Sequence, residues 1–297
     1  MTLARALLRL MRPHQWIKNG FVFLGPVFGH AWNDPKTVVE ALALFAAFCL
    51  VSSAVYTMND IADRDADRLH PTKRFRPLDR GDVGLGPASA LCAGLALAGV
   101  ALAAWVSPSA LALVGAYVVL NIAYSAGLKH IAILDVFMIS AGFMLRILAG
   151  TIGLGIPPSK WLLLCGLTLT LFLGFSKRRA ELLLTVTGTA DSDGASSHRA
   201  SLDGYSRTLL DVLITVSVSC SAIGYALYSV DAETVALHGT DKLILTLPFV
   251  LYGLFRYLQV MYVKGGGGDP AWDVLHDPHL IATIVGWLGA TAWILSG

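Results

Sequence analysis

Charged side chains are scarce in this sequence. Only 14% of the 297 residues are Asp, Glu, Lys or Arg, whereas 55% are hydrophobic. A soluble domain carries about 25% charged residues, so this composition excludes a soluble globular protein. The chain is predicted to be an integral membrane protein. The formal net charge is only +2, and we expect no nucleic-acid partner.

The sequence also has few cysteines, and its first residues do not have the pattern of a cleavable signal peptide. The four cysteines lie in separate apolar runs without metal-ligand spacing, so we interpret them as small apolar residues. The first 19 residues carry dispersed basic residues and no small-residue cleavage site, which does not fit a signal peptide. We expect residues 1–16 to form an amphipathic segment at the membrane surface.

Long apolar stretches dominate the rest of the chain. A membrane-spanning helix needs about 20 mostly apolar residues, and nine stretches approach or exceed that length. They lie near 17–33, 37–59, 87–106, 109–127, 131–151, 160–176, 208–230, 242–263 and 279–296. We therefore predict one all-α, polytopic membrane domain over residues 1–297, with long connecting segments near 60–86, 177–207 and 264–278.

Basic residues concentrate on one side of the predicted membrane. Nearly all of the 22 lysines and arginines fall in one set of connecting segments, and the other set holds only Lys36, Lys160 and Lys242. Positively charged segments stay in the cytoplasm. We therefore predict a multi-pass protein of the inner or plasma membrane, with its charged segments and its chemistry facing the cytosol.

A cluster of aspartates ends the second predicted span, in the sequence NDIADRDAD. If the helix continues, Asp60, Asp63 and Asp67 lie within about 60° of one another on one face. Like charges at this spacing destabilise a helix unless they are compensated. A divalent cation with oxygen ligands, and Mg²⁺ in particular, is the compensation that we favour. The alternative is a solvated helix end with local ion pairs to Arg64 and Arg68.

A basic stretch, HPTKRFRP, follows the aspartates. It contributes Lys73, Arg74 and Arg76, and Arg and Lys are the side chains that recognise phosphate. The same residues also fit positive-inside topology and contact with lipid head groups. We predict that they bind a phosphate-bearing substrate.

Further polar candidates lie at or within the other spans. Lys18 enters the first span, and Tyr124 and Lys129 end the fourth, where Lys129 also fits a simple topology marker. Asp135 lies inside the fifth span, where an ionised carboxylate is costly and usually functional. Arg146 lies about 16 Å further along the helix, too far for a direct pair, so it either reaches outward or meets a polar group on another helix.

The end of the sixth span reads GFSKRRAELLL. Lys177 and Arg178 are candidates for binding a further phosphate, although Lys177 and Glu181 also have the spacing of an ordinary helical ion pair.

The acidic motif resembles that of a known membrane family. NDIADRDAD matches the NDxxDxxxD pattern of the UbiA-type intramembrane prenyltransferase superfamily, with Asn59, Asp60, Asp63 and Asp67 at the fixed positions. Nine spans are also similar to that superfamily. The resemblance implies that this motif holds Mg²⁺ against a diphosphate. Aromatic-acceptor members carry a second DxxxD motif, and this chain has cations at the equivalent segment instead.

The chain resembles one branch more closely, the decaprenyl-phosphate phosphoribosyltransferases. The resemblance rests on RPHQWIKN, NDIADRDADRLHPTKRFRP, YSAGLKHIAILDV, FMLRILAG, GFSKRRAEL and GGGGDPAWDVLHDPHL. It implies transfer of 5-phosphoribose from phosphoribosyl diphosphate to a polyprenyl phosphate, with release of diphosphate. The product would supply lipid-linked pentose for cell-envelope arabinan.

Roles follow from that implied reaction. Asp60, Asp63 and Asp67 would hold the cation that neutralises the leaving diphosphate, and Asp135 would stabilise the ribosyl cation. The predicted phosphate contacts are Lys177 and Arg178 for the acceptor, and Lys73, Arg74 and Arg76, supported by Lys18 or Lys129, for the donor. Asn59, Tyr124 and Arg146 complete the predicted substrate-binding set.

Two alternatives remain open on the sequence. One is a UbiA-type enzyme that moves a prenyl group onto an aromatic or quinone precursor. The other is a transporter or channel, which would place charges near the bilayer midplane. Membrane lipids are expected partners in each case, and a homo-oligomer is left open.

Overall fold

The chain is all-α over the residues that the structure describes, as the sequence predicts. The computed structural model describes residues 2–64, 67, 75–186 and 201–296. These residues contain helices and turns but no β-strand. They form two compact units, the first comprising residues 2–158 and the second residues 159–186 and 201–296.

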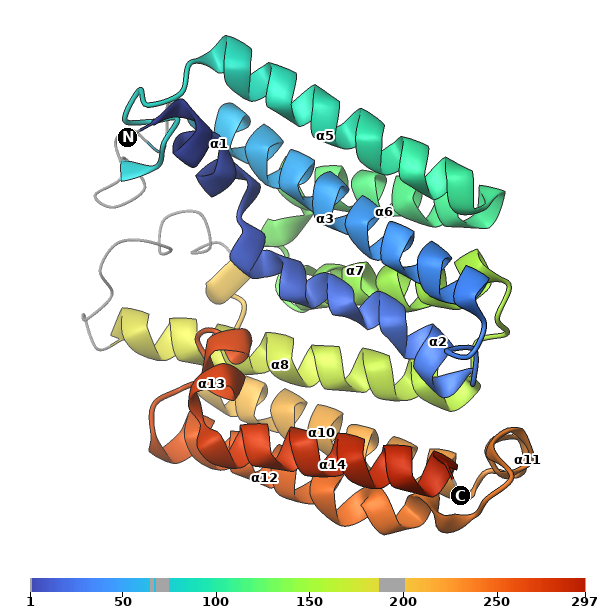
Figure 1. Ribbon diagram of the computed structural model, residues 1–297. Helices are drawn as coiled ribbons and strands as arrows, with labels where there is room; N and C mark the ends of the chain where they lie inside the picture. The colour runs from blue at the N-terminus through green and yellow to red at the C-terminus, as the bar shows by residue number, and fades with distance from the viewer. Residues whose placement is uncertain (1, 65–66, 68–74, 187–200, 297) are drawn as a thin grey trace. The chain divides into compact units, whose positions relative to one another are not determined.

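The first unit combines long α-helices with 3₁₀-helical segments (Figure 1). Its elements are α1 (Leu3–Met11), η1 (Pro13–Phe23), α2 (Leu24–Phe28), α3 (Pro35–Ala62), α5 (Leu85–Val106), α6 (Pro108–Ala126), η3 (Leu128–His130), α7 (Leu134–Gly150) and η4 (Ile152–Leu154).

The second unit contains four long helices joined by shorter ones. Its elements are α8 (Lys160–Val186), α10 (Arg207–Val230), α11 (Ala232–His238), η5 (Lys242–Thr246), α12 (Leu247–Val263), α13 (Pro270–His276) and α14 (Pro278–Ser296).

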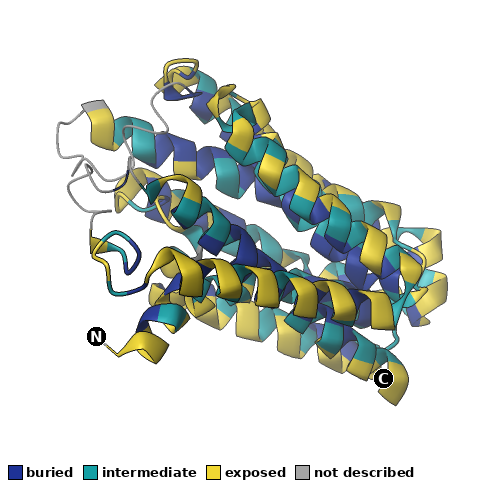
Figure 2. Cartoon of the chain, turned by 90° about the horizontal axis from the view of Figure 1, so that it is seen from above, coloured by how far each residue is buried: buried dark blue, intermediate teal, exposed yellow. Residues whose placement is uncertain are grey.

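Eight of the nine predicted spans are long apolar helices among the described residues. Their exposed side chains include Leu97, Trp105 and Val119, which are 72%, 63% and 66% exposed. Figure 2 shows buried and exposed residues alternating around the same helices. Apolar side chains on an outer face are the expected lipid contacts of a membrane-spanning helix. The chain is an integral, multi-pass membrane protein.

The first predicted span, near 17–33, has a different structure. It forms the 3₁₀-helix η1 followed directly by the short helix α2, rather than one long α-helix. A 3₁₀-helix has three residues per turn, so every third side chain points the same way. Trp16, Asn19, Val22 and Gly25 follow that period of three. They contact α3 or α7 through hydrogen bonds or close packing.

The 3₁₀ geometry also matches η1 to its neighbour in length. The two segments run antiparallel, with Arg12 bonded to Asp60 at one end and the Phe23 ring 5.3 Å from the Phe45 ring at the other. Eleven residues at about 2.0 Å per residue and fifteen at about 1.5 Å both cover about 22 Å. Together η1 and α2 extend about 30 Å, the thickness of the hydrocarbon layer.

The far end of this segment meets α7 with almost no space between the backbones. A Cβ atom added to Gly25 would lie 1.8 Å from the carbonyl oxygen of Gly150. A Cβ atom added to Gly150 would lie 1.8 Å from the carbonyl oxygen of Val22. Only glycine allows this approach, which resembles the small-residue contacts between membrane helices.

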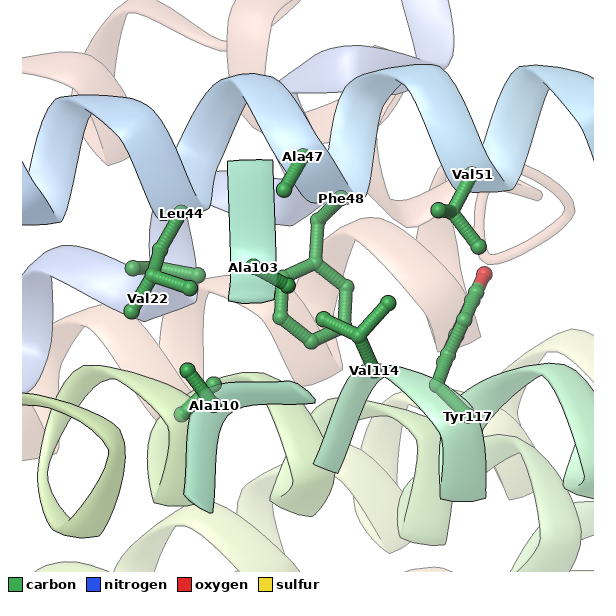
Figure 3. Close-up of a cluster of buried hydrophobic side chains, with 10 residues drawn as sticks. Val22, Leu44, Ala47, Phe48, Val51, Ala103, Ala110, Val114 and Tyr117 are labelled. Atoms are coloured by element: carbon green, nitrogen blue, oxygen red, sulfur yellow. The ribbon is translucent and has the colours of Figure 1, made fainter. Parts of the chain in front are cut away.

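A buried apolar cluster lies beside this contact (Figure 3). Val22, Leu44, Phe48, Val114 and Tyr117 bring side chains from η1, α3 and α6 together. The Phe48 and Tyr117 rings meet edge to face with centroids 5.4 Å apart, an arrangement favoured by the ring quadrupoles.

The predicted amphipathic segment 1–16 is shorter than expected. Helix α1 ends at Met11, because Pro13 disfavours the helical conformation at Arg12. Its buried residues, Ala6 and Leu10, pack against Leu78 and Val83 of the same chain, while Leu3 is 52% exposed.

In the second unit, α8 continues ten residues beyond its predicted end at 176. The extension KRRAELLLTV consists largely of good helix formers, and ion pairs of its buried arginines anchor it. The Nε of Arg179 donates to Asp211 of α10 at 2.6 Å, and the Tyr262 hydroxyl of α12 donates to the same oxygen at 2.8 Å. A second polar contact links Tyr225, Thr246 and Trp287.

The glycine contact generates the first prediction. We expect Gly150→Ala to lower the free energy of unfolding by about 3 kcal/mol, because the backbones must separate. Gly115→Ala in α6 is the matched control, since a Cβ atom there meets nothing within 4 Å and alanine stabilises a helix. Thermal unfolding in detergent measures both. Equal stability of the two variants would contradict the close contact.

Candidate functional site

Two of the three predicted metal-ligating aspartates lie together at the end of α3. Asp60 and Asp67 are each only 3% exposed. The backbone N–H of Asp63 donates to Asn59 at 2.9 Å, and that of Asp67 donates to Asp63 at 2.8 Å, so the helical turns continue past α3. The side chain of Asp63 is exposed, and no group of three His, Cys, Asp or Glu residues within the described ranges is placed to hold a metal ion.

Two arginines neutralise the buried aspartates. Nη1 of Arg76 lies 3.0 Å from Oδ1 of Asp60 and 2.5 Å from Oδ2 of Asp67. Nη2 of Arg12 donates to the same Asp60 oxygen at 2.6 Å. The predicted substrate residue Arg76 therefore belongs to this cluster, whereas Lys73 and Arg74 lie outside the described residues.

Arg12 is a site residue that the sequence analysis missed. It lies between α1 and η1 with φ 52° and ψ 59°, a left-handed conformation that few residues other than glycine adopt. Its guanidinium lies 5.1 Å from the centre of the Tyr56 ring, one turn before Asp60 on α3. An Arg–Pro pair directly after a short amphipathic helix is the sequence signal that marks this position.

The end of α6 lies beside the acidic cluster. The Ser125 hydroxyl donates to Oδ1 of Asn59 at 3.0 Å, which joins the predicted substrate residue Asn59 to α6. The neighbouring Tyr124 is half-buried, as is Lys129 in η3. Lys18 is also half-buried, directly before the buried Asn19 of η1. These positions are compatible with the predicted roles but do not test them.

Asp135 is fully buried at the start of α7. Its side chain is 0% exposed, and Oδ1 accepts a hydrogen bond from the backbone N–H of Val136 at 2.8 Å. The residue lies in the first helical turn, where a carboxylate is stabilised by the helix dipole. This location supplies a structural reason for a buried carboxylate, and its predicted catalytic role remains a prediction.

Arg146 meets polar groups on other helices, one of the two outcomes that the sequence left open. Its Nε donates to Oδ1 of Asn19 at 2.7 Å, and Nη2 donates to the Tyr117 hydroxyl at 3.0 Å. Its Nη1 donates to the carbonyl of Gly142 at 2.8 Å. The guanidinium also lies within 5.7 Å of the Phe48, Tyr117 and Phe143 ring centres. Aromatic faces attract a desolvated cation, so these contacts join η1, α3, α6 and α7 in the membrane.

The predicted acceptor residues lie in the second unit. Arg178 is 2% exposed, and its Nη1 donates to Oε2 of Glu181 at 2.5 Å. Lys177 is exposed, with Nζ 3.9 Å from Oε1 of the same glutamate. The ordinary helical pair that the sequence left open is therefore present. Lys177 presents an accessible ammonium group, while Arg178 is held in the interior by Glu181.

The glycine-rich segment before α14 has defined turns. Gly265 and Gly267 have φ of 73° and 99°, and the N–H of Gly267 donates to Asp273 at 2.6 Å. Asp277 then caps α14 and accepts hydrogen bonds from Arg256 at 3.1 and 2.8 Å. The Arg256 guanidinium holds the pKa of the Asp277 carboxyl well below its ordinary value.

The chain is thus an intramembrane protein of apolar helices, with buried aspartates paired with arginines at the end of α3. The chain belongs to the UbiA prenyltransferase family, whose model matches residues 20–265. As a member of that transferase family, the protein is an enzyme.

Named relatives extend over nearly the whole chain. Two decaprenyl-phosphate phosphoribosyltransferases are similar to it. The one from Corynebacterium glutamicum is 33% identical, with 96% of this chain and 85% of that protein covered. The one from Mycolicibacterium smegmatis is 32% identical, with 97% and 91% covered.

A solved UbiA homologue from Archaeoglobus fulgidus, bound to GPP and Mg²⁺, has the same fold. The TM-score is 0.68 at 17% identity, over 98% of this chain and all of that one.

The Arg146 contacts generate a second prediction. Arg146→Ala removes a buried cation and leaves Asn19 and Tyr117 without their partner, so we expect a loss of about 3 kcal/mol in the free energy of unfolding. A double-mutant cycle with Asn19→Ala should give a coupling energy of about 1–3 kcal/mol. The cycle of Arg146 with Ser125, which bonds Asn59 instead, should be additive. Coupling energies of equal size would contradict the assignment.

Asp277 generates a third prediction, on pH. A carboxyl whose pKa is lowered by folding stabilises the protein above its unfolded pKa of about 4, and this stabilisation is lost as the pH falls below that value. Wild type should therefore unfold at a higher temperature than Asp277→Asn at pH 7, and the difference should shrink between pH 4 and pH 3. A difference that widens with acid would contradict this sign.

Proposed function

We propose that the protein transfers 5-phosphoribose from phosphoribosyl diphosphate to a polyprenyl phosphate and releases diphosphate, using Mg²⁺ at the cytosolic membrane face. The similarity to the two named phosphoribosyltransferases, which covers nearly the whole chain, carries this proposal. The product would serve as a lipid-linked pentose donor for arabinan synthesis in the cell envelope.

The acidic cluster has the donor chemistry that a divalent cation requires. A single nitrogen of Arg76 lies within 3.0 Å of both the Asp60 and the Asp67 carboxylates, so the two carboxylates face one shared position that already holds a cationic group. Carboxylate oxygens are the preferred ligands of Mg²⁺. Asp60 and Asp67 would hold the ion, with Asp63 as an exposed third carboxylate. Bound Mg²⁺ would neutralise charge on the departing diphosphate.

The remaining residues of the first unit would bind and orient the donor. Arg12 and Arg76 offer guanidinium groups beside the carboxylates, and Arg–phosphate contacts are strong and directional. Lys18 and Lys129, both half-buried, would supply further positive charge. Asp135 is fully buried. Its carboxylate would stabilise the ribosyl cation, and the variant Asp135→Asn tests this role.

The acceptor needs cations rather than a strong base. A phosphomonoester has a second pKa of about 6, so its oxygen is already anionic in the cytosol and attacks C1 of the ribose as the C1–diphosphate bond breaks. Lys177 is exposed on α8, just past the predicted end of the span at 176, and would contact this phosphate, with Glu181 positioning it beside Arg178. The cations at this position also favour a phosphate acceptor over an aromatic one.

The distribution of charge supports the proposed cytosolic location. Arg12, Arg76 and Lys177 belong to the predicted set of connecting segments that holds nearly all of the lysines and arginines, and such segments stay inside. A soluble polyanionic donor and the head group of a lipid acceptor both reach a site at that membrane surface.

The fourth prediction is an assay of the purified protein. We expect Mg²⁺-dependent movement of ribose label from phosphoribosyl diphosphate into polyprenyl phosphate, and its loss with EDTA. Asp60→Asn should lower kcat by about 100-fold or more, because an electrostatic contact to the leaving group is lost. Lys177→Ala should raise the KM for the lipid about tenfold, the effect of one charged hydrogen bond.

Matched variants separate these effects from general damage. Asp82→Asn removes a carboxylate that lies 3.9 Å from the exposed Arg80. Lys36→Ala removes a lysine with the same i,i+4 glutamate geometry as Lys177. Both controls should behave like wild type. Folded protein that transfers no label to any polyprenyl phosphate, yet prenylates an aromatic acceptor, would overturn the proposal.

A further inference from the structure

We propose that Arg76 is an exchangeable counter-ion of Asp60 and Asp67: its guanidinium lies between the two carboxylates that would hold the divalent cation, and it moves to the diphosphate when that cation binds. Arg12 stays on Asp60 throughout. The proposal rests on the metal site of the proposed function and adds a role that links cation binding to substrate binding.

The position of Arg76 carries the first step. One atom, Nη1, lies 3.0 Å from the Asp60 carboxylate and 2.5 Å from the Asp67 carboxylate. Both carboxylates are buried, and a buried carboxylate requires a counter-charge. A divalent cation that binds both oxygens must therefore displace this nitrogen. The Arg76 side chain is 30% exposed, so its guanidinium has solvent into which it can move.

Arg12 differs from Arg76 in how firmly it is placed. Its guanidinium lies over the Tyr56 ring and bonds Asp60 at 2.6 Å, and its backbone keeps a left-handed conformation. Such a conformation persists only where surrounding contacts enforce it. Of the two carboxylates, Arg12 pairs with that of Asp60, through an oxygen that it shares with Arg76, whereas Arg76 joins both. Cation entry therefore requires displacement of Arg76 but not of Arg12.

Charge balance gives the functional consequence. Among the described residues, the guanidinium groups of Arg12 and Arg76 pair with the carboxylates of Asp60 and Asp67. A cation that enters alone must displace Arg76 and leave that guanidinium without its partners, which weakens cation binding. When diphosphate enters as well, the displaced guanidinium gains a new anionic partner. Cation and diphosphate should therefore bind cooperatively, and by linkage each should strengthen the other by the same factor.

Mn²⁺ binding measured by electron paramagnetic resonance tests this role without any turnover. The probes are Mn²⁺ alone and Mn²⁺ with inorganic diphosphate, with free Mn²⁺ corrected for its diphosphate complex. In wild type we expect weak Mn²⁺ binding that diphosphate strengthens. In Arg76→Gln we expect Mn²⁺ alone to bind about tenfold more tightly, the effect of removing one charged competitor, and the strengthening by diphosphate to fall by about the same factor.

Arg80→Gln is the matched control for the loss of one positive charge nearby. Arg80 is 54% exposed and lies 3.9 Å from Asp82, so its removal reports only the long-range field. Arg76→Lys keeps the charge and provides a second variant if Arg76→Gln does not fold. Arg76→Lys should bind Mn²⁺ alone as weakly as wild type does.

The outcomes separate this proposal from the one on which it rests. If Arg76→Gln binds Mn²⁺ with the same affinity as Arg80→Gln, or more weakly than wild type, the exchange is overturned and the metal site is left intact. Wild type that binds no Mn²⁺ even with diphosphate would overturn the metal site and the exchange together. The exchange is supported if Arg76→Gln binds Mn²⁺ alone more tightly while diphosphate strengthens that binding less, and if Arg80→Gln shows neither change. Loss of a purely structural residue would not produce this combination.

Discussion

The antiparallel contact between η1 and α3 is the constraint on which the first unit depends. A 3₁₀-helix and an α-helix rise by different amounts per residue, yet eleven residues of one cover the same length as fifteen of the other between Arg12–Asp60 and Phe23–Phe45. This match fixes both ends at once. Arg12 meets the acidic cluster at one end of the segment, and the glycine contact between Gly25 and Gly150 holds the other end against α7.

Buried charges in this protein are compensated locally, and in three different ways. Asp60 and Asp67 share arginines, Arg178 and Arg179 each have a carboxylate within one unit, and Arg146 is surrounded by an amide, a hydroxyl and aromatic faces. A charge with a mobile partner can take part in ligand binding, while a charge fixed on several rigid helices mainly joins them. By this criterion the acidic cluster is suited to ligand binding, whereas Arg146 mainly joins helices.

Much of the fold could be predicted because the bilayer imposes a simple length and composition on each helix. Eight predicted spans agree with the long apolar helices, and the NDxxDxxxD motif located the acidic cluster. The 3₁₀ form of η1 could not be predicted in this way, since apolarity does not separate a period of 3.0 from one of 3.6 over a few turns. Arg12 was missed because its role depends on a contact 48 residues away, and the extension of α8 because charged residues there resembled a solvated connection.

The three-residue period of η1 has a consequence for how this segment varies. A substitution changes one contact, but inserting or deleting a single residue rotates every later side chain by about 120° and shifts it by about 2 Å. Those of Trp16, Asn19, Val22 and Gly25 that follow the change would then leave their partners together. The spacing between Arg12 and Gly25 is therefore a stricter signature of this architecture than the identity of any residue between them, and a sequence alignment of this segment should contain substitutions but no gaps.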